Sequence, residues 1–359
     1  MRGAFLCFIT SGAEATDPSE VVSQPVNSVA PLLFRIRVEY AARTMDPLVS
    51  LSAVHDARTS IGTVAIRTPL IRLNVTNAPA EIYLKLENLQ PIGSFKIRGA
   101  ANAIAKLSSE KIQHGVVTAS AGNMAQGVAW VARSLGVDAT IIAPDTAPEI
   151  KIKAIERLGG RVIKVSFDEW WRAFEERAYP GVDGAFIHAF DDPDVMAGNG
   201  TIALEVLEDL PEVDAIVIPW GGGGLTCGIA SVLRQVCPSC KIFTAEVATA
   251  APLAASWSAG RPTEVEYQRS FVDGIGSKAV FPHMFERAKR LIDDALVAEL
   301  ESVARTVRLL VEFNHTVAEG AGATSVACAL SGKAGKGKVV CVVSGGNIDP
   351  KKLAELLRG

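Results

Sequence analysis

The chain has 359 residues, of which 48% are hydrophobic and 21% charged, the balance of a globular protein with one large or two medium domains. A net charge of −3 gives no electrostatic basis for binding nucleic acid or an anionic membrane surface, and no run of about 18 apolar residues could span a bilayer. Six cysteines in so long a chain do not form a disulfide framework, which favours a cytoplasmic location.

The first 44 residues mix Ser, Pro, Ala and Thr without clear periodicity. We predict that 1–44 is an extension, either disordered or the product of an upstream start, because it imitates a signal peptide only weakly. Organised sequence begins at Met45-Asp46-Pro47, and apolar residues at helical spacing predict a first helix from Leu48 to Ile61.

After a turn at Thr68-Pro69-Leu70 that leads into a short strand, β-type runs alternate with amphipathic helical patterns. Strands are predicted at 82–86, 116–119, 140–143, 161–165, 185–187, 215–218, 242–246 and 338–343. This alternation predicts an α/β fold with parallel strands and crossover helices. In such sheets ligands bind beyond the carboxyl ends of the strands, at a topological switch point, so we expect the chemistry there.

Three strand ends carry polar or glycine-rich sequence. Thr118-Ala119-Ser120-Ala121-Gly122-Asn123 precedes a helix predicted at 124–135, whose start offers N–H groups to a carboxylate or phosphate; an ordinary N-cap by Ser120 or Asn123 is the alternative. Pro219-Trp220-Gly221-Gly222-Gly223-Gly224-Leu225 favours a phosphate-binding loop over a linker, because several backbone N–H groups can turn toward one anion. Val342-Val343-Ser344-Gly345-Gly346-Asn347 should project Ser344 into the same crevice.

One lysine stands in a Gly/Ser turn, in Gly93-Ser94-Phe95-Lys96-Ile97-Arg98-Gly99-Ala100. A lysine amine can form a Schiff base with a carbonyl, and pyridoxal phosphate is the commonest cofactor that offers one. Taken alone, Lys96 is more simply a solvated surface charge.

Together and in this order, these segments resemble the fold-type II pyridoxal-phosphate enzymes, the tryptophan-synthase-β-like family, and among them the serine/threonine dehydratases (ammonia-lyases) and serine racemases. Further matching segments are Ala197-Gly198-Asn199-Gly200-Thr201 and Glu319-Gly320-Ala321-Gly322. The resemblance implies two three-layer α/β/α domains with mostly parallel sheets and the cofactor in the cleft between them. The large domain would comprise 45–107 and 190–359, and a small mobile domain 108–189. It also implies an amino-acid substrate and a homodimer.

The resemblance assigns roles to individual residues. Lys96 would bind pyridoxal phosphate covalently and remove the substrate Cα proton. The other implied cofactor-binding residues are Phe95 beside the ring, Asn123 at its phenolic oxygen, Gly221, Gly222, Gly223, Gly224 and Leu225 at the phosphate, Glu319 near the ring, and Ser344 at the pyridine nitrogen. The backbone of Ser120, Ala121, Gly122 and Asn123 would bind the substrate carboxylate.

The choice of reaction depends on Ala121. A racemase of this family needs a second base on the opposite face of Cα, where the matching loop has a serine in its second position, and alanine cannot transfer a proton. We therefore predict a carbon–oxygen lyase of amino-acid catabolism that converts a β-hydroxy-amino acid, by default L-threonine or L-serine, to a 2-oxo acid and ammonia. Another substrate such as 3-hydroxyaspartate or phenylserine, a racemase, and a cofactor-binding protein without activity are the alternatives.

Several other residues invite a functional interpretation. Some relatives bind a divalent ion after the strand that follows the glycine loop; Glu246 is present here, but Pro252 stands where an Asp would be needed, so no metal-binding residues are expected. A monovalent cation held by carbonyl oxygens is the alternative. The Cys237/Cys240 pair falls at the end of a helix, which favours a structural role over a redox one.

The loop after the strand predicted at 185–187 contains His188, for which a structural role is favoured, and two aspartates, Asp191 and Asp192, that are expected to cap a helix beginning near Pro193. The side chains expected to line the substrate pocket are Phe190, Trp220 and Met124.

Overall fold

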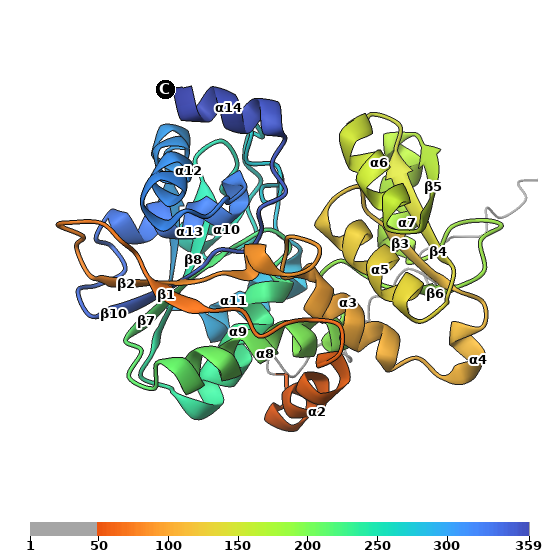
Figure 1. The fold of residues 1–359 in the computed structure, drawn as a ribbon, viewed down its shortest axis with the longest axis horizontal. Helices are drawn as coiled ribbons and strands as arrows, with labels where there is room; N and C mark the ends of the chain where they lie inside the picture. Colours follow the sequence, from red (N-terminus) through yellow and green to blue (C-terminus); the bar gives the residue numbers. More distant parts are fainter. Residues whose placement is uncertain (1–48, 359) are drawn as a thin grey trace, which may run out of the picture. The chain divides into compact units, whose positions relative to one another are not determined.

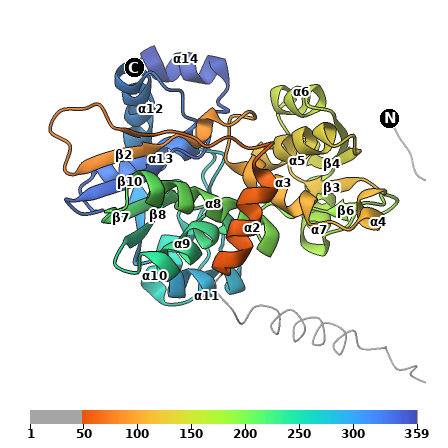
Figure 2. The same cartoon turned by 60° about the horizontal axis from the view of Figure 1, so that its bottom comes forward.

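The computed structural model describes residues 49–358, so the extension predicted for 1–44 lies outside the described residues. Within 49–358 the chain forms one six-stranded and one four-stranded sheet, each with helices on both faces (Figures 1 and 2). The described part of the chain contains no helix that is both long enough and apolar enough to cross a membrane. The predicted α/β fold with mostly parallel sheets is confirmed.

The six-stranded sheet has the order β1-β2-β10-β7-β8-β9. β1 runs antiparallel to β2, and all other neighbours are parallel. Its strands are β1 (Leu70–Arg72), β2 (Glu81–Lys85), β7 (Ala215–Pro219), β8 (Lys241–Val247), β9 (Asp294–Ala298) and β10 (Lys338–Val342).

Both faces of this sheet are buried, which is why its central strands read as continuous apolar runs. Ile216 and Ile218 of β7 pack in one core with α2, α8, α9, α10 and α11, whereas Ala215 and Val217 pack in the other with α12 and α13. Figure 1 shows α12 and α13 across the sheet from α8 and α9. The bounds are α2 (Leu51–Ile61), α8 (Pro193–Asp209), α9 (Gly224–Val236), α10 (Pro252–Ala259), α11 (Pro282–Leu291), α12 (Leu300–Asn314), α13 (Gly320–Leu330) and α14 (Pro350–Arg358).

The four-stranded sheet is wholly parallel, in the order β5-β4-β3-β6. One face packs against α3, α5 and α6, and the other against α7, which inserts Phe174 into a separate core. The elements are α3 (Lys96–Ala105), α4 (Ser109–Ile112), β3 (Val116–Ala119), α5 (Asn123–Ser134), β4 (Ala139–Pro144), α6 (Glu149–Arg157), β5 (Gly160–Val165), α7 (Phe167–Glu176) and β6 (Ala185–Phe186).

Each sheet has a topological switch point. In the six-stranded sheet the chain passes from β7 outward to β8 and β9, and β10 returns to the opposite side of β7. In the four-stranded sheet β6 returns in the same way beside β3. The carboxyl ends of β7, β10 and β3 therefore mark the places where such folds bind ligands. These ends carry the glycine run, the Ser344 segment and the Ser120–Asn123 segment.

All eight strands predicted by range are present, with ends that differ by at most one residue. The first helix begins at Leu51 rather than Leu48, because the Ser50 side chain caps it by accepting from the Ala53 N–H at 3.2 Å. Sequence reasoning missed β9, a strand at the edge of its sheet whose short apolar run, 295–298, ends two residues before α12 and so merges with the helical pattern.

Candidate active site

Lys96 is the first residue of α3. Part of its side chain reaches solvent, but its amine is enclosed: Nζ donates to the carbonyl oxygen of Ala189 at 2.5 Å and lies 5.2 Å from the centre of the Phe95 ring. Burial lowers the pKa of this amine to about 8. A larger fraction is therefore neutral at physiological pH than in an exposed lysine, which increases its nucleophilicity.

The segment after β10 packs against the turn that precedes Lys96. Ser94 forms an antiparallel bridge with Gly345, and the Phe95 N–H donates to the Ser344 carbonyl at 3.0 Å. Ser344 itself is buried, with 4% of its surface exposed. Two stretches separated by about 250 residues of sequence thus form one wall of the site, with Ser344 beside the base of the lysine.

Asn123 is held at both ends of its amide. Its Nδ2 donates to Oε1 of Glu319 at 2.8 Å, and its Oδ1 accepts from Nδ2 of Asn347 at 2.8 Å. An amide nitrogen has two N–H groups, so this orientation leaves one of them for a ligand. Burial, helped by the charge of Asp273, raises the pKa of Glu319 to about 7, against the opposing effect of the Asn123 hydrogen bond.

The glycine run forms the turn between β7 and α9. Gly223 has φ +91°, and no side chain caps the start of α9. A Cβ on Gly222 would collide with the Phe190 ring, and one on Gly224 would lie 2.5 Å from the Phe190 carbonyl. The Nδ2 of Asn199 donates to the Gly224 carbonyl at 3.3 Å and so fixes the loop from behind. Free N–H groups at the start of α9 suit an anion such as a phosphate.

The start of α5 is likewise without a side-chain cap. Ser120 Oγ accepts from the Gly122 N–H at 3.2 Å, within the turn, and a Cβ built on Gly122 would meet nothing within 4 Å. The alternative of an ordinary N-cap by Ser120 or Asn123 is therefore wrong. The first N–H groups of α5, which begins at Asn123, therefore have no side-chain cap.

Comparisons with known proteins agree with this geometry. Residues 61–345 match the family described as pyridoxal-phosphate dependent enzyme. The chain belongs to this family. It is 41% identical to an L-threonine ammonia-lyase from Thermotoga maritima over 86% of this chain and 78% of that protein. The processed threonine deaminase isoform 2 from Solanum lycopersicum has a similar fold, with a TM-score of 0.79, 31% identity and coverage of 96% and 92%. A maize serine racemase has a TM-score of 0.79, 29% identity and coverage of 87% and 97%.

The residues present fit pyridoxal phosphate, the cofactor of this family of enzymes. An enclosed amine of lowered pKa suits its aldehyde, and the glycine turn before α9, where no side chain caps the helix, offers backbone N–H groups to its phosphate. Sequence reasoning gave no role to Asn347, although its position three residues after Ser344 was the available signal.

The loop after β6 in this pyridoxal-phosphate enzyme is held by hydrogen bonds and ion pairs. His188 Nδ1 accepts from the N–H groups of Phe190 and Asp191 at 3.3 and 2.9 Å, and burial lowers its pKa to about 3, so the ring is neutral. Asp192 caps α8, as predicted, by accepting from the N–H groups of Asp194 and Val195. The prediction was wrong for Asp191, which pairs instead with Arg177 and His283.

Two of the three predicted pocket residues pack in cores instead. Met124 belongs to the core shared by α3 and α5, and Trp220 lies beneath Gly223 in the core of the six-stranded sheet. Their apolar side chains follow strand ends, which led sequence reasoning to place them at the crevice. Phe190 contacts the glycine run through its ring and its backbone.

Glu246 and the cysteine pair have structural roles. The carboxylate of Glu246 accepts from the N–H groups of Leu253 and Ala254 at 3.0 and 2.7 Å, so it caps α10, which begins at Pro252. Residues 49–358 contain no cluster of three or more His, Cys, Asp or Glu suited to a metal ion. Cys237 follows the last turn of α9, and burial raises the pKa of Cys240 to about 12, the opposite of a redox-active thiol.

Proposed function

We propose that this pyridoxal-phosphate enzyme is an ammonia-lyase that converts L-threonine or L-serine to a 2-oxo acid and ammonia by α,β-elimination. The observation that supports this most strongly is the 41% identity to the L-threonine ammonia-lyase of Thermotoga maritima across 86% of the chain. Dehydration of another β-hydroxy-amino acid, such as 3-hydroxyaspartate or phenylserine, is the nearest alternative.

The proposed roles are those that the resemblance to the family implies, and the surroundings of the residues support them. Lys96 bears the cofactor. The N–H groups from Gly221 to Leu225 hold its phosphate, the remaining N–H of Asn123 Nδ2 binds its phenolic oxygen, and Ser344 donates to its ring nitrogen. Phe95 packs beside the ring, and Glu319 keeps the Asn123 amide in orientation. When bound, pyridoxal phosphate supplies an electron sink for charge that develops at the substrate Cα.

The protein contributes binding and proton transfer. The free N–H groups at the start of α5 bind the substrate carboxylate and so orient the Cα–H bond toward Lys96. Once the substrate amine has displaced Lys96 from the cofactor, the freed Nζ would be the base that accepts this proton; burial lowers the pKa of the free amine to about 8, and the Ala189 carbonyl lies within hydrogen-bond distance of it. Loss of the β-hydroxyl group and hydrolysis then yield the 2-oxo acid and ammonia.

Ala121 favours elimination over racemisation. It lies in the turn before α5, where a methyl group offers no proton to the face of Cα opposite Lys96. A racemase therefore remains the second candidate, suggested by the likeness to the maize serine racemase. Assembly as a homodimer, a cytoplasmic location and the division into domains 45–107 with 190–359 and 108–189 stay predictions.

A substrate panel tests the proposal. Purified holoenzyme should release 2-oxo acid and ammonia from L-threonine or L-serine faster than from 3-hydroxyaspartate or phenylserine. Release of a D-amino acid without ammonia would overturn it in favour of racemisation.

Replacement of the lysine tests its role separately. Lys96→Ala should remove the absorbance of the lysine-bound cofactor, expected at about 410 to 420 nm, and lower kcat by at least about 10³-fold. Survival of that absorbance in the variant would contradict the role given to Lys96. Arg67→Gln, a change on an exposed ion pair, should keep both properties.

A further inference from the structure

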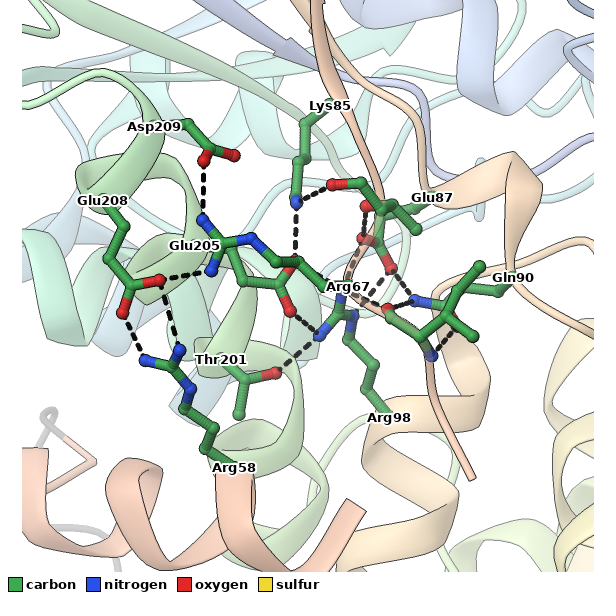
Figure 3. A network of polar contacts seen from close by, with 12 residues as sticks. Arg58, Arg67, Lys85, Glu87, Gln90, Arg98, Thr201, Glu205, Glu208 and Asp209 are labelled. Carbon is green, nitrogen blue, oxygen red and sulfur yellow. Dashed lines mark hydrogen bonds and ion pairs between the residues drawn. The ribbon is translucent and has the colours of Figure 1, made fainter. Parts of the chain in front are cut away.

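Behind the site lies a buried network of charges that the proposed mechanism does not use (Figure 3). Two cations, Lys85 of β2 and Arg98 of α3, meet two anions, Glu87 and Glu205, and all four are at least 94% buried. The charges balance within the group. The network joins the end of β2, the first turn of α3 and the middle of α8.

Arg98 is the centre of the network. Its Nε and Nη2 donate to the two oxygens of Glu87, both at 2.8 Å, in a bidentate pair. Its Nη1 and Nη2 donate to the two oxygens of Glu205 at 2.7 and 2.9 Å. Figure 3 shows the guanidinium between the two carboxylates, with Thr201 beside it. Burial alone would raise the pKa of Glu87, but the Arg98 charge and hydrogen bonds outweigh it and lower that pKa.

Arg98 lies two residues after Lys96 in the same helical turn. Side chains at positions i and i+2 of a helix do not face each other, so Lys96 points to the site while Arg98 points away from it. No side chain caps the start of α3. Gly198 of α8 lies so close to the Arg98 carbonyl that a Cβ there would collide with it, and this close approach brings Thr201 and Glu205 to the guanidinium.

We propose that Arg98 is a positioning residue that fixes the orientation of Lys96 toward the cofactor. The four-group network clamps the first turn of α3 from the side opposite the amine. Side-chain atoms lie roughly 6 Å from a helix axis, so a rotation of the turn by about 10° would move the amine by about 1 Å. A displacement of that size can slow a reaction by about 10²-fold.

A buried ion network is not explained by stability alone. Replacing buried ion pairs by apolar residues of similar volume is often neutral or stabilising, because desolvation offsets the attraction between the charges. What apolar packing does not provide is the planar, multiply hydrogen-bonded geometry of a guanidinium between two carboxylates, which fixes direction as well as distance. Lysine keeps the charge of Arg98 but not this geometry.

The test compares two ligands of the apoenzyme. Pyridoxal phosphate must bond to Lys96, whereas pyridoxamine phosphate, which lacks the aldehyde, reports only on the phosphate loop and ring contacts. In Arg98→Lys we expect pyridoxal phosphate to form the lysine-bound species, followed at about 410 to 420 nm, roughly 10- to 100-fold more slowly, while the affinity for pyridoxamine phosphate changes less than about twofold. Because the inference rests on Lys96 bearing the cofactor, wild type must form that species; failure there would overturn both proposals.

Two control variants separate an effect on the orientation of Lys96 from a general loss of protein stability. Val307→Ala removes buried volume from α12, in the core on the other face of the six-stranded sheet, and Arg67→Gln removes the exposed arginine that pairs with Glu208 and Asp209 of α8. Both should bond pyridoxal phosphate at the wild-type rate. Glu87→Gln, which weakens the clamp without removing Arg98, should slow the reaction by a smaller factor and serves if Arg98→Lys does not fold. The positioning role would be refuted if Arg98→Lys and Glu87→Gln bonded pyridoxal phosphate at the wild-type rate. It would also be refuted if Arg98→Lys weakened the binding of pyridoxamine phosphate as much as it slowed the bonding of pyridoxal phosphate.

Discussion

At the scale of single residues, the protonation of Glu319 should make the free energy of unfolding depend on pH. Its native pKa is about 7, whereas its ordinary value is 4.5, because burial disfavours the carboxylate. Between these values the folded protein holds a proton that the unfolded chain has released, so stability present at low pH is lost as pH rises through the folded pKa. The slope is at most about 1.4 kcal/mol per pH unit, which gives up to about 3 kcal/mol over the interval.

Glu319→Gln should remove this dependence. Urea unfolding of the apoenzyme at pH 5 and at pH 7.5 would show wild type losing stability relative to the variant as pH rises. Glu246, whose pKa burial also raises to about 7, titrates in both proteins and cancels in the comparison. Glu301→Gln, a change on an exposed helix position, provides the control. A constant difference between wild type and Glu319→Gln would contradict the raised pKa.

At the scale of elements, the turn between β7 and α9 depends on glycine for space. Gly222→Ala would drive its Cβ into the Phe190 ring, which packs against Phe174, His188 and Phe281 and has little room to move. We expect the affinity for pyridoxal phosphate to fall by about tenfold or more, by equilibrium dialysis, since a shifted loop misdirects its N–H groups. Gly221→Ala, whose Cβ would make an ordinary 3.5 Å contact with the Gly274 carbonyl, should lose less. Equal losses would show that crowding is not the cause.

The same elements show how much sequence reasoning could reach. Strands buried on both faces appear in the sequence as apolar runs, so the fold was predictable. Polar and glycine-rich motifs follow the carboxyl ends of these strands, so the grouping of Lys96, Asn123 and Ser344 at one site was predictable too. The network around Arg98 was not, because its four charges lie in three separate stretches of the sequence, at 85–87, 98 and 205, and no helical or strand spacing connects these stretches. Trp220 shows a second limit of sequence reasoning. Its position at the end of a strand was predictable, but whether its side chain faces the ligand crevice or the core was not, and it lies in the core.

At the scale of the whole molecule, the site draws on both sheets, and an exposed ion pair joins them beside it. Lys151 of α6 lies 2.7 Å from Asp273, which precedes Gly274 next to Glu319. An exposed pair of this kind contributes about 0.2 to 1 kcal/mol. If substrate binds only while α6 lies against this loop, as it does here, the pair stabilises the binding-competent arrangement by up to that amount.

Lys151→Ala should therefore raise KM for the amino acid about two- to fivefold, with kcat nearly unchanged and the free energy of unfolding lowered by no more than about 1 kcal/mol. Because salt screens exposed charges, raising ionic strength should increase the wild-type KM toward that of the variant while leaving the variant itself unaffected. Lys164→Ala, which breaks the exposed Lys164–Glu149 pair within the four-stranded part alone, should change neither constant. Steady-state kinetics at low and high salt test this: an equal KM in Lys151→Ala and wild type would mean that the contact between α6 and the Asp273 loop does not contribute to substrate binding.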